Sequence, residues 1–232
     1  MPLFKTIVAE GSGNQDDTYV GAWSSSNWDT ARNVYIANTR LDSQSNSLNG
    51  VYSVKLAGRG GGSTWYNYRS LFSFDLDTMT GINMEKAEVK IKMIKYSGSG
   101  INHTKVCLVH MVESMNGNTG DYDGMLDGSD DMVLISDVLT TPILSATQLT
   151  FTLNAAGLAI VNQLITGSST PSGSTRYFEV ALVSYTYDYN DRDPVSNSIR
   201  VRVYYQEEGG TETPRLLLYP ADYSSLSMGI NF

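Results

Sequence analysis

Nine short runs rich in β-branched and aromatic residues constrain the fold of this chain more than any other feature. Each run is bounded by Gly, Asn, Asp or Pro, the residues that favour turns. Short strands separated by turns predict two packed antiparallel sheets. We expect strands at residues 5–11, 33–40, 70–76, 88–96, 105–112, 148–154, 177–185, 199–206 and 215–220.

The pattern inside these runs indicates which side of each strand is buried. Val89, Ile91 and Met93 alternate with charged residues, which predicts one buried and one solvated face. One segment departs from this pattern: residues 154–167 place apolar side chains at helical spacing between Asn154 and Gly167. The sequence therefore predicts an all-β sandwich, a single domain over residues 1–232, with one short helix.

Charge and apolar content exclude two classes of partner. The chain has 16 Lys and Arg against 24 Asp and Glu, a net charge of -8. Nucleic-acid binding needs a surplus of cations, so we expect no nucleic-acid partner. No run approaches the ~20 apolar residues of a membrane span, so we expect no membrane partner. Cys107, the single cysteine, lies in the apolar run KVCLVHMV and is predicted to be a buried thiol.

The order of several motifs resembles the DNRLRE-type, disaggregatase-related family of carbohydrate-binding-like modules. These motifs are an Asp-Thr-Tyr-Val opening, an Asn-Trp pair, an Arg followed by Phe-Asp-Leu, an alternating strand and a closing Pro-Arg-Leu strand. They lie at Asp17 to Val20, Asn27 and Trp28, Arg69 with Phe74 to Leu76, Ala87 to Met93, and Pro214 to Leu218. The resemblance covers most of the chain and implies a β-sandwich of jelly-roll type.

The resemblance also implies structural roles for the run YRSLFSFDLDTM, residues 68 to 79. Its three large apolar side chains would fill the core, and Arg69 would lie near a strand end where a carboxylate or a carbonyl accepts its hydrogen bonds. Asp75 and Asp77 would shape the exit turn. The apolar residues are Leu71, Phe72 and Phe74.

An acidic loop at residues 115–131 is the candidate metal site. Asp121, Asp123 and Asp127 offer the hard oxygen ligands that Ca²⁺ prefers on a glycine-bearing loop. Their spacing is not that of an EF-hand, and solvated loop charge is the favoured interpretation. We otherwise expect no cofactor.

Signals for catalysis are weak. His103 and His110 are the two histidines, and neither forms an identifiable set with a nucleophile and an acid. A glycan hydrolase or lyase would need two carboxylates at a separation that a sequence does not give. We therefore expect no enzyme activity and keep glycan cleavage as the weakest hypothesis.

Aromatic residues in the polar loops are the candidate binding residues. Trp65 ends the glycine-rich stretch at 57–65, and Tyr66 and Tyr68 follow it. Tyr187 and Tyr189 lie in the stretch 187–198. Rigid aromatic side chains dominate many interfaces, so we expect these five to be contact anchors. Trp28 falls where the DNRLRE-type family has a packed aromatic residue, so the resemblance implies that it packs in the core.

Two non-enzymatic functions remain. The first is a structural protein of a virus particle, a phage capsid decoration or tail-attached module, with other virion proteins such as a capsid lattice, or a second copy, as partners. The expected location is the virion, because the first residues turn polar too early for an export leader. The second is a carbohydrate-binding module that recognises polysaccharide outside the cell or at its surface.

Overall fold

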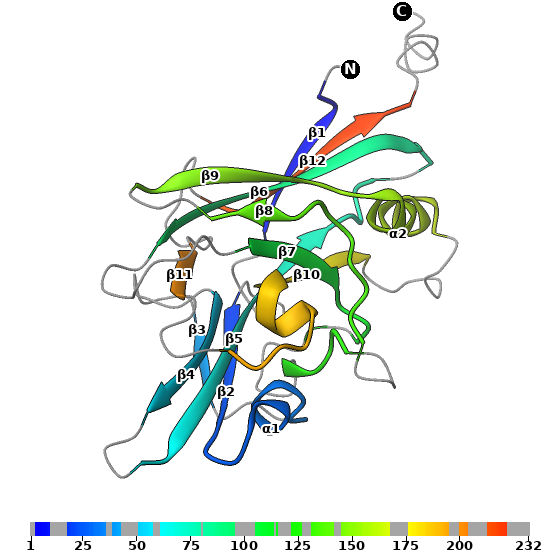
Figure 1. The fold of residues 1–232 in the computed structure, drawn as a ribbon. Helices are drawn as coiled ribbons and strands as arrows, with labels where there is room; N and C mark the ends of the chain where they lie inside the picture. Colours follow the sequence, from blue (N-terminus) through cyan, green and yellow to red (C-terminus); the bar gives the residue numbers. More distant parts are fainter. Residues whose placement is uncertain are drawn as a thin grey trace, which may run out of the picture.

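The fold is an antiparallel β-sandwich, as the sequence predicts. The computed structural model describes residues 3–9, 18–35, 39–42, 51–57, 61–79, 81–95, 105–113, 115, 122–126, 131–141, 145–167, 176–194, 200–203 and 213–221. The twelve strands in these ranges form one continuous hydrogen-bonded network in which every pairing is antiparallel. The network folds back on itself into two packed layers (Figure 1).

The first layer joins strands from both ends of the chain. Its order is β1, β12, β6 and β9, and β6 is the long central strand. The bounds are Lys5–Val8 for β1, Arg215–Pro220 for β12, Met84–Lys95 for β6 and Thr147–Thr152 for β9.

The second layer is built around β5, which pairs with β2, β4 and β10 along different parts of its length. β3 extends it beyond β2, and β7 and β8 extend it beyond β10. β11 pairs with both β6 and β4 and so connects the two layers. The bounds are β2 Thr18–Ser24, β3 Thr39–Asp42, β4 Val51–Ala57, β5 Ser63–Asp75, β7 Lys105–His110, β8 Leu139–Thr140, β10 Tyr177–Ser184 and β11 Arg200–Val203.

The main core lies between the two layers. Phe72 and Phe74 of β5 are fully buried there, and the rings of Phe74 and Phe178 lie 6.4 Å apart. The facing layer contributes the inward residues of β6, which confirms their predicted alternation. These residues are Ala87, Val89, Ile91 and Met93.

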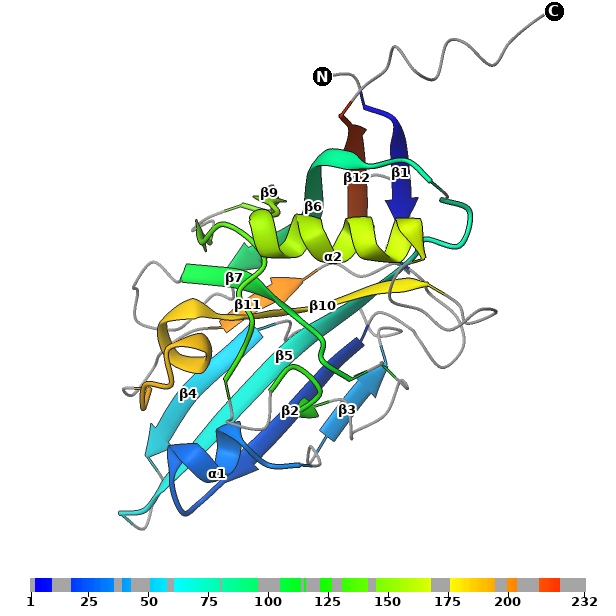
Figure 2. The same ribbon diagram turned by 90° about the vertical axis from the view of Figure 1, so that its right-hand side faces the viewer.

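The predicted short helix is α2, Ala155–Thr166, which lies across one end of the sandwich (Figure 2). The Asn154 side chain accepts hydrogen bonds from the backbone N–H groups of Ala156 and Gly157, at 3.0 and 3.1 Å, and so caps the first turn. Gly167 ends the helix in the left-handed conformation, φ 71°. None of the helices in the described ranges is long and apolar enough to cross a membrane.

The predicted strand at 33–40 is wrong at residues 33–35 and right at residues 39–40, and residues 36–38 lie outside the described residues. Residues 28–32 form the short helix α1, Trp28–Arg32, because the Asn27 side chain accepts a hydrogen bond from Thr30 N–H at 2.8 Å. Asn33 to Tyr35 are not strand, and β3 begins only at Thr39. No strand was predicted at β2, β4 or β8, and the start of β5 was predicted to be a loop.

A second core covers the outer face of the β2, β5, β10 and β7 sheet. Tyr122 and Met125 are fully buried against Leu71 of β5 and Ala181 of β10. Both belong to the stretch 115–131, which the sequence analysis treated as a polar loop. Tyr122 and Met125 therefore pack on the sheet, where a solvated loop was predicted.

The exit turn after β5 has the predicted form. The backbone N–H of Asp77 donates to the Asp75 side chain at 2.7 Å. The Asp77 side chain in turn accepts from the backbone N–H of Arg176 at 2.7 Å, which connects the turn to the start of β10.

Replacing Phe74 with Ala tests the main core. The Phe74 ring is fully buried, so its removal leaves a cavity, and we expect a loss of about 3–5 kcal/mol in the free energy of unfolding. Urea unfolding measures this loss. Val112→Ala, at a position that is 50% exposed, is the control and should change stability little. Equal effects of the two changes would contradict the assignment of the core.

A buried ion pair beneath the candidate contact surface

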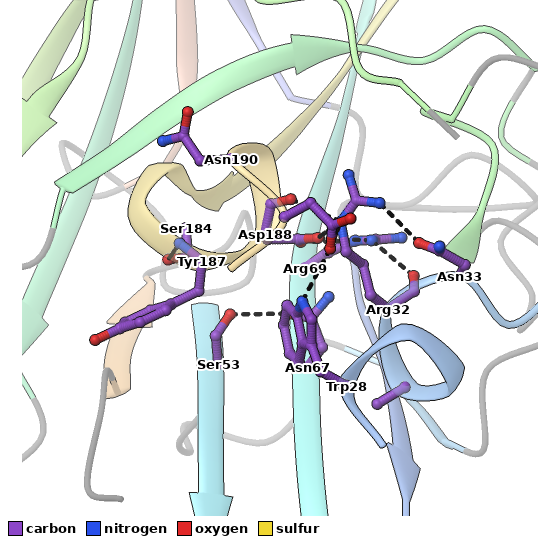
Figure 3. A network of polar contacts seen from close by, with 12 residues as sticks. Trp28, Arg32, Asn33, Ser53, Asn67, Arg69, Ser184, Tyr187, Asp188 and Asn190 are labelled. Carbon is purple, nitrogen blue, oxygen red and sulfur yellow. Dashed lines mark hydrogen bonds and ion pairs between the residues drawn. The ribbon is translucent and has the colours of Figure 1, made fainter. Parts of the chain in front are cut away.

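Arg69 and Asp188 form an ion pair that is completely shielded from solvent. Arg69 lies in the middle of β5, and Asp188 lies 119 residues later in the turn after β10. The guanidinium donates two hydrogen bonds to the carboxylate, at 2.8 and 2.7 Å, and both side chains are 0% exposed (Figure 3). Such two-point contacts are among the strongest between side chains.

Backbone carbonyls complete the surroundings of Arg69. Its guanidinium also donates to the carbonyl of Arg32 at 2.9 Å and to the carbonyl of Tyr122. The prediction that a carboxylate or carbonyl would accept from Arg69 is confirmed, but its predicted place near a strand end is wrong. Burial works to lower the pKa of Arg69, but the charge of Asp188, the nearby Tyr122 and the hydrogen bonds to Asp188 together outweigh it. The pKa is therefore raised and the side chain stays charged.

A second arginine supports the same carboxylate. Arg32, at the end of α1, is 3% exposed, and its Nε donates to the Asp188 backbone carbonyl at 2.8 Å. The same nitrogen lies 3.6 Å from the Asp188 carboxylate and 3.5 Å from that of Asp191. Asp191 has a positive φ of 46°, a conformation that few residues other than glycine adopt without cost.

A chain of polar side chains extends the network across the sheet. Ser53 of β4 donates to Asn67 of β5 at 2.7 Å, and Asn67 donates to the Tyr122 hydroxyl at 2.9 Å (Figure 3). Tyr122 donates to the Ala31 carbonyl at 2.6 Å. Burial raises the pKa of Tyr122 well above its usual range, so this hydroxyl remains a donor. The network thus connects β4, β5, α1 and the second core.

The turn that carries Asp188 is a π-helix, Tyr185–Tyr189. Its backbone directs Asp188 into the network, whereas Tyr187 points away from it (Figure 3). Tyr189 stacks on Tyr185 with ring centres 5.3 Å apart and packs against the second core. Tyr187 and Tyr189 were both predicted to be contact anchors. Tyr189 instead packs within the fold. Wide turns of this kind occur often at functional sites.

Two tryptophans bind the segment after the π-helix. The indole N–H of Trp28, which is 3% exposed, donates to Asp191 at 3.1 Å. The indole N–H of Trp65 donates to Asp193 at 2.6 Å. The ammonium of Lys55 lies 4.5 Å from the centre of the Trp65 ring and 3.7 Å from Asp193. Trp28 is buried, as predicted, and Trp65 belongs to a strand where a loop was predicted.

The three predicted anchors on β5 do not share one surface. Successive strand residues point to opposite faces, so Trp65 shares a face with Asn67 and Arg69, while Tyr66 and Tyr68 lie on the other. In register with Tyr66 on β2 is Trp23, which is 50% exposed. We call Trp23, Tyr66 and Tyr68 the aromatic row.

Gly21 makes room for one member of the aromatic row. It is in register with Tyr68, and a Cβ atom at Gly21 would lie 2.1 Å from the Tyr68 ring. The ring therefore covers the bare backbone of β2, which only glycine permits. Tyr68 also packs against the edge of the main core, so the row continues the inner face of the sandwich along the ribbon of β2, β5 and β4.

The candidate metal ligands are described only in part. Asp121 and Asp127 lie outside the described residues. Asp123 is half-buried, and its backbone carbonyl accepts from the N–H of Leu126 at 2.7 Å in a tight turn. Among the described residues, no group of three or more His, Cys, Asp or Glu side chains is close enough to hold a metal ion. The calcium hypothesis stays a prediction.

His103 lies outside the described residues, and the other titratable candidates lie inside the fold. Cys107 is fully buried, and burial raises the pKa of its thiol. His110 is at the end of β7, with Nδ1 3.4 Å from the Glu179 carbonyl, and burial lowers the pKa of its ring. Glu179 is 6% exposed and accepts from the Met115 N–H at 3.2 Å.

Comparisons with known proteins add no relative to this description. No protein-family model matches the chain, and no curated protein matches it. The DNRLRE-type resemblance therefore stays a prediction that depends on the order of the sequence motifs. The site must be interpreted from its own geometry.

Replacing Asp188 with Asn should strongly destabilise the protein. The change leaves Arg69 charged and buried without its counter-ion, which costs about 3–5 kcal/mol in the free energy of unfolding. Chemical unfolding measures this loss of stability. Asp29→Asn, at an exposed position of α1, is the matched control. Arg69→Met in the Asp188→Asn background should cost less than the sum of the two single changes. Additive effects would contradict the pairing.

His110 should make the fold less stable in mild acid. Because burial lowers its folded pKa, the unfolded chain binds a proton first as the pH falls through about 6.5. Stability is therefore lost between that pH and the lower folded pKa. His110→Gln should show a smaller loss of unfolding free energy between pH 7 and pH 5 than the unmodified protein. Parallel stability profiles of the two proteins would show that His110 is not the cause.

Proposed function

We propose that the protein is a non-enzymatic structural component of a virus particle, a capsid decoration or tail-attached module. It docks to another particle protein through the aromatic row. The observation that carries this proposal is the half-exposed Trp23, placed in register with Tyr66 on a rigid strand ribbon. Large aromatic side chains on rigid elements supply much of the energy of protein interfaces.

The buried ion pair supports this use of the ribbon because it fixes the ribbon in place. Strand β5 carries Tyr66 and Tyr68 toward one side and Arg69 toward the other. Arg69 is hydrogen-bonded to Asp188, to α1 and to the second core. These bonds fix β5 on the face opposite to Tyr66 and Tyr68. A rigid ribbon loses little conformational freedom when its aromatic residues bind a partner.

A non-enzymatic role is consistent with how the charged residues are used. Arg69 and Asp188 are both fully buried and bonded to each other, and Tyr122 donates to a backbone carbonyl. These three side chains are buried and hydrogen-bonded within the network. Their role is therefore structural. Their geometry offers a substrate no direct access.

The second candidate is a carbohydrate-binding module, and the aromatic row is also what favours it. Sugar rings stack on flat aromatic faces, and an extended ribbon can present several such faces in line. Trp65 suits this role less well, because its indole N–H is bonded to Asp193 and the Lys55 ammonium lies over its ring. Under either function the contact is centred on Trp23.

Replacing Trp23 with Ala separates the two functions from a purely structural role of the side chain. We expect the variant to fold and to be lost from particles assembled with it, because its contact area with the lattice is removed. Quantitative mass spectrometry of purified particles measures its copy number. Tyr35→Ala is the matched control, since Tyr35 is 68% exposed and lies outside the aromatic row.

A glycan array with the same three proteins identifies the partner. Normal incorporation of the Trp23→Ala variant, or absence of the unmodified protein from particles, would overturn the docking proposal. Saturable glycan binding that is lost in Trp23→Ala and kept in Tyr35→Ala would favour the carbohydrate-binding module. Incorporation that depends on Trp23 without any glycan signal would support the particle protein.

A further inference from the structure

The outer face of the first layer collects positive charge in a chain that is acidic as a whole. Three lysines of β6 alternate with its buried residues and therefore point outward, and Arg215 of β12 is in register with one of them, Lys90. Glu88 is the one carboxylate among the outward positions of β6 from 86 to 92. We call this set the cationic face: Lys86, Lys90, Lys92 and Arg215.

The single acid on the cationic face is neutralised locally. Glu88 lies 2.7 Å from the Lys86 ammonium and accepts from the Tyr219 hydroxyl at 2.9 Å. Partial burial works to raise the pKa of Glu88, but Lys86, Tyr219 and Lys90 outweigh it, so the pKa is lowered. The face therefore keeps a positive surplus, although the chain as a whole carries a net charge of -8.

The complementary charge is present in the same chain. Residues 106–175 contain no Lys or Arg but seven acids. Asp137 lies beside the first layer, because its side chain accepts from the Thr152 N–H of β9 at 3.0 Å. The other six are Glu113, Asp121, Asp123, Asp127, Asp130 and Asp131. Within this stretch Tyr122 and Met125 pack on the outer face of the second layer, on the far side of the molecule from the cationic face. Glu113 and Asp131 are exposed there.

We propose that the cationic face binds the acidic cover of the second layer, around Glu113 and Asp131, in a second copy of this chain. The two surfaces differ and lie on opposite layers, so each copy can contact two neighbours head to tail. Contacts of this kind generate rings if the rotation closes and open rows if it does not. This inference does not depend on the aromatic row or on the proposed particle function.

Screening by salt distinguishes this contact from an apolar one. The Debye length falls from about 10 Å at 0.1 M salt to about 3 Å at 1 M, so an interface held by exposed charges weakens strongly over this range. We expect sedimentation velocity to show masses above the 25.4 kDa monomer at about 0.1 M salt and the monomer at about 1 M.

Charge reversal locates the contact. Lys90→Glu should weaken self-association about tenfold or more, because a favourable contact becomes a repulsive one. Lys5→Glu is the matched control, since it changes the net charge equally at an exposed position of β1. Lys5 is in register with Leu218, a main-core residue, so it lies on neither proposed contact surface and its reversal should have little effect. Circular dichroism and thermal unfolding confirm that each variant is folded.

Mixing two reversed proteins gives the decisive result. A Lys90→Glu, Lys92→Glu protein and a Glu113→Lys, Asp131→Lys protein should each be monomeric alone and associate with each other when mixed. A wild-type protein that is monomeric at all salt concentrations would overturn the proposal. It would do so even if an unrelated acidic protein bound the cationic face. Equal effects of Lys90→Glu and Lys5→Glu, or no association on mixing, would overturn it too.

Discussion

The structure depends on the need to compensate one buried guanidinium. A charged arginine inside a protein is tolerated only when opposite charge and hydrogen-bond acceptors surround it. Arg69 obtains them from three places that are distant in the sequence: Asp188, the end of α1 and the start of the buried stretch at Tyr122. Each of these segments must be correctly placed before Arg69 is satisfied, so one side chain coordinates the position of all three.

This requirement explains why the sheet has a core on each face. Between the layers, β5 and β10 bury Phe and Leu side chains in the usual manner of a sandwich. On the other face, methionines and Tyr122 close over Leu71 and Ala181 and exclude water from the Arg69–Asp188 pair. The outer cover is therefore part of the electrostatic design, because the ion pair would be screened and weakened in contact with solvent.

Local patterns predicted much of the fold and little of the site. Alternation identified the inward face of β6, and Asn154 with Gly167 marked both ends of α2, since these signals lie within a few adjacent residues. α1 was not predicted, because five residues are too few to show helical spacing. Arg69 in an apolar run did indicate an acceptor, but its partner is 119 residues away, and no local pattern distinguishes Asp188 from the other acids. Trp23 was not among the predicted anchors, because Trp65, Tyr66 and Tyr68 adjoin the glycine-rich stretch and were preferred to it.

The pairing of β1 with β12 has a consequence for how the chain reaches its folded state. Among the described strands, β1 pairs with β12 alone, with Lys5 opposite Leu218. Contacts between the first and last described strands therefore close a loop of more than two hundred residues. Closing such a loop is entropically costly, and topologies rich in distant pairings fold slowly. On the ribosome, β1 would emerge before the other described strands and would be the last of them to find its neighbour. Until then, the edge of β6 that β12 occupies is open to other strands.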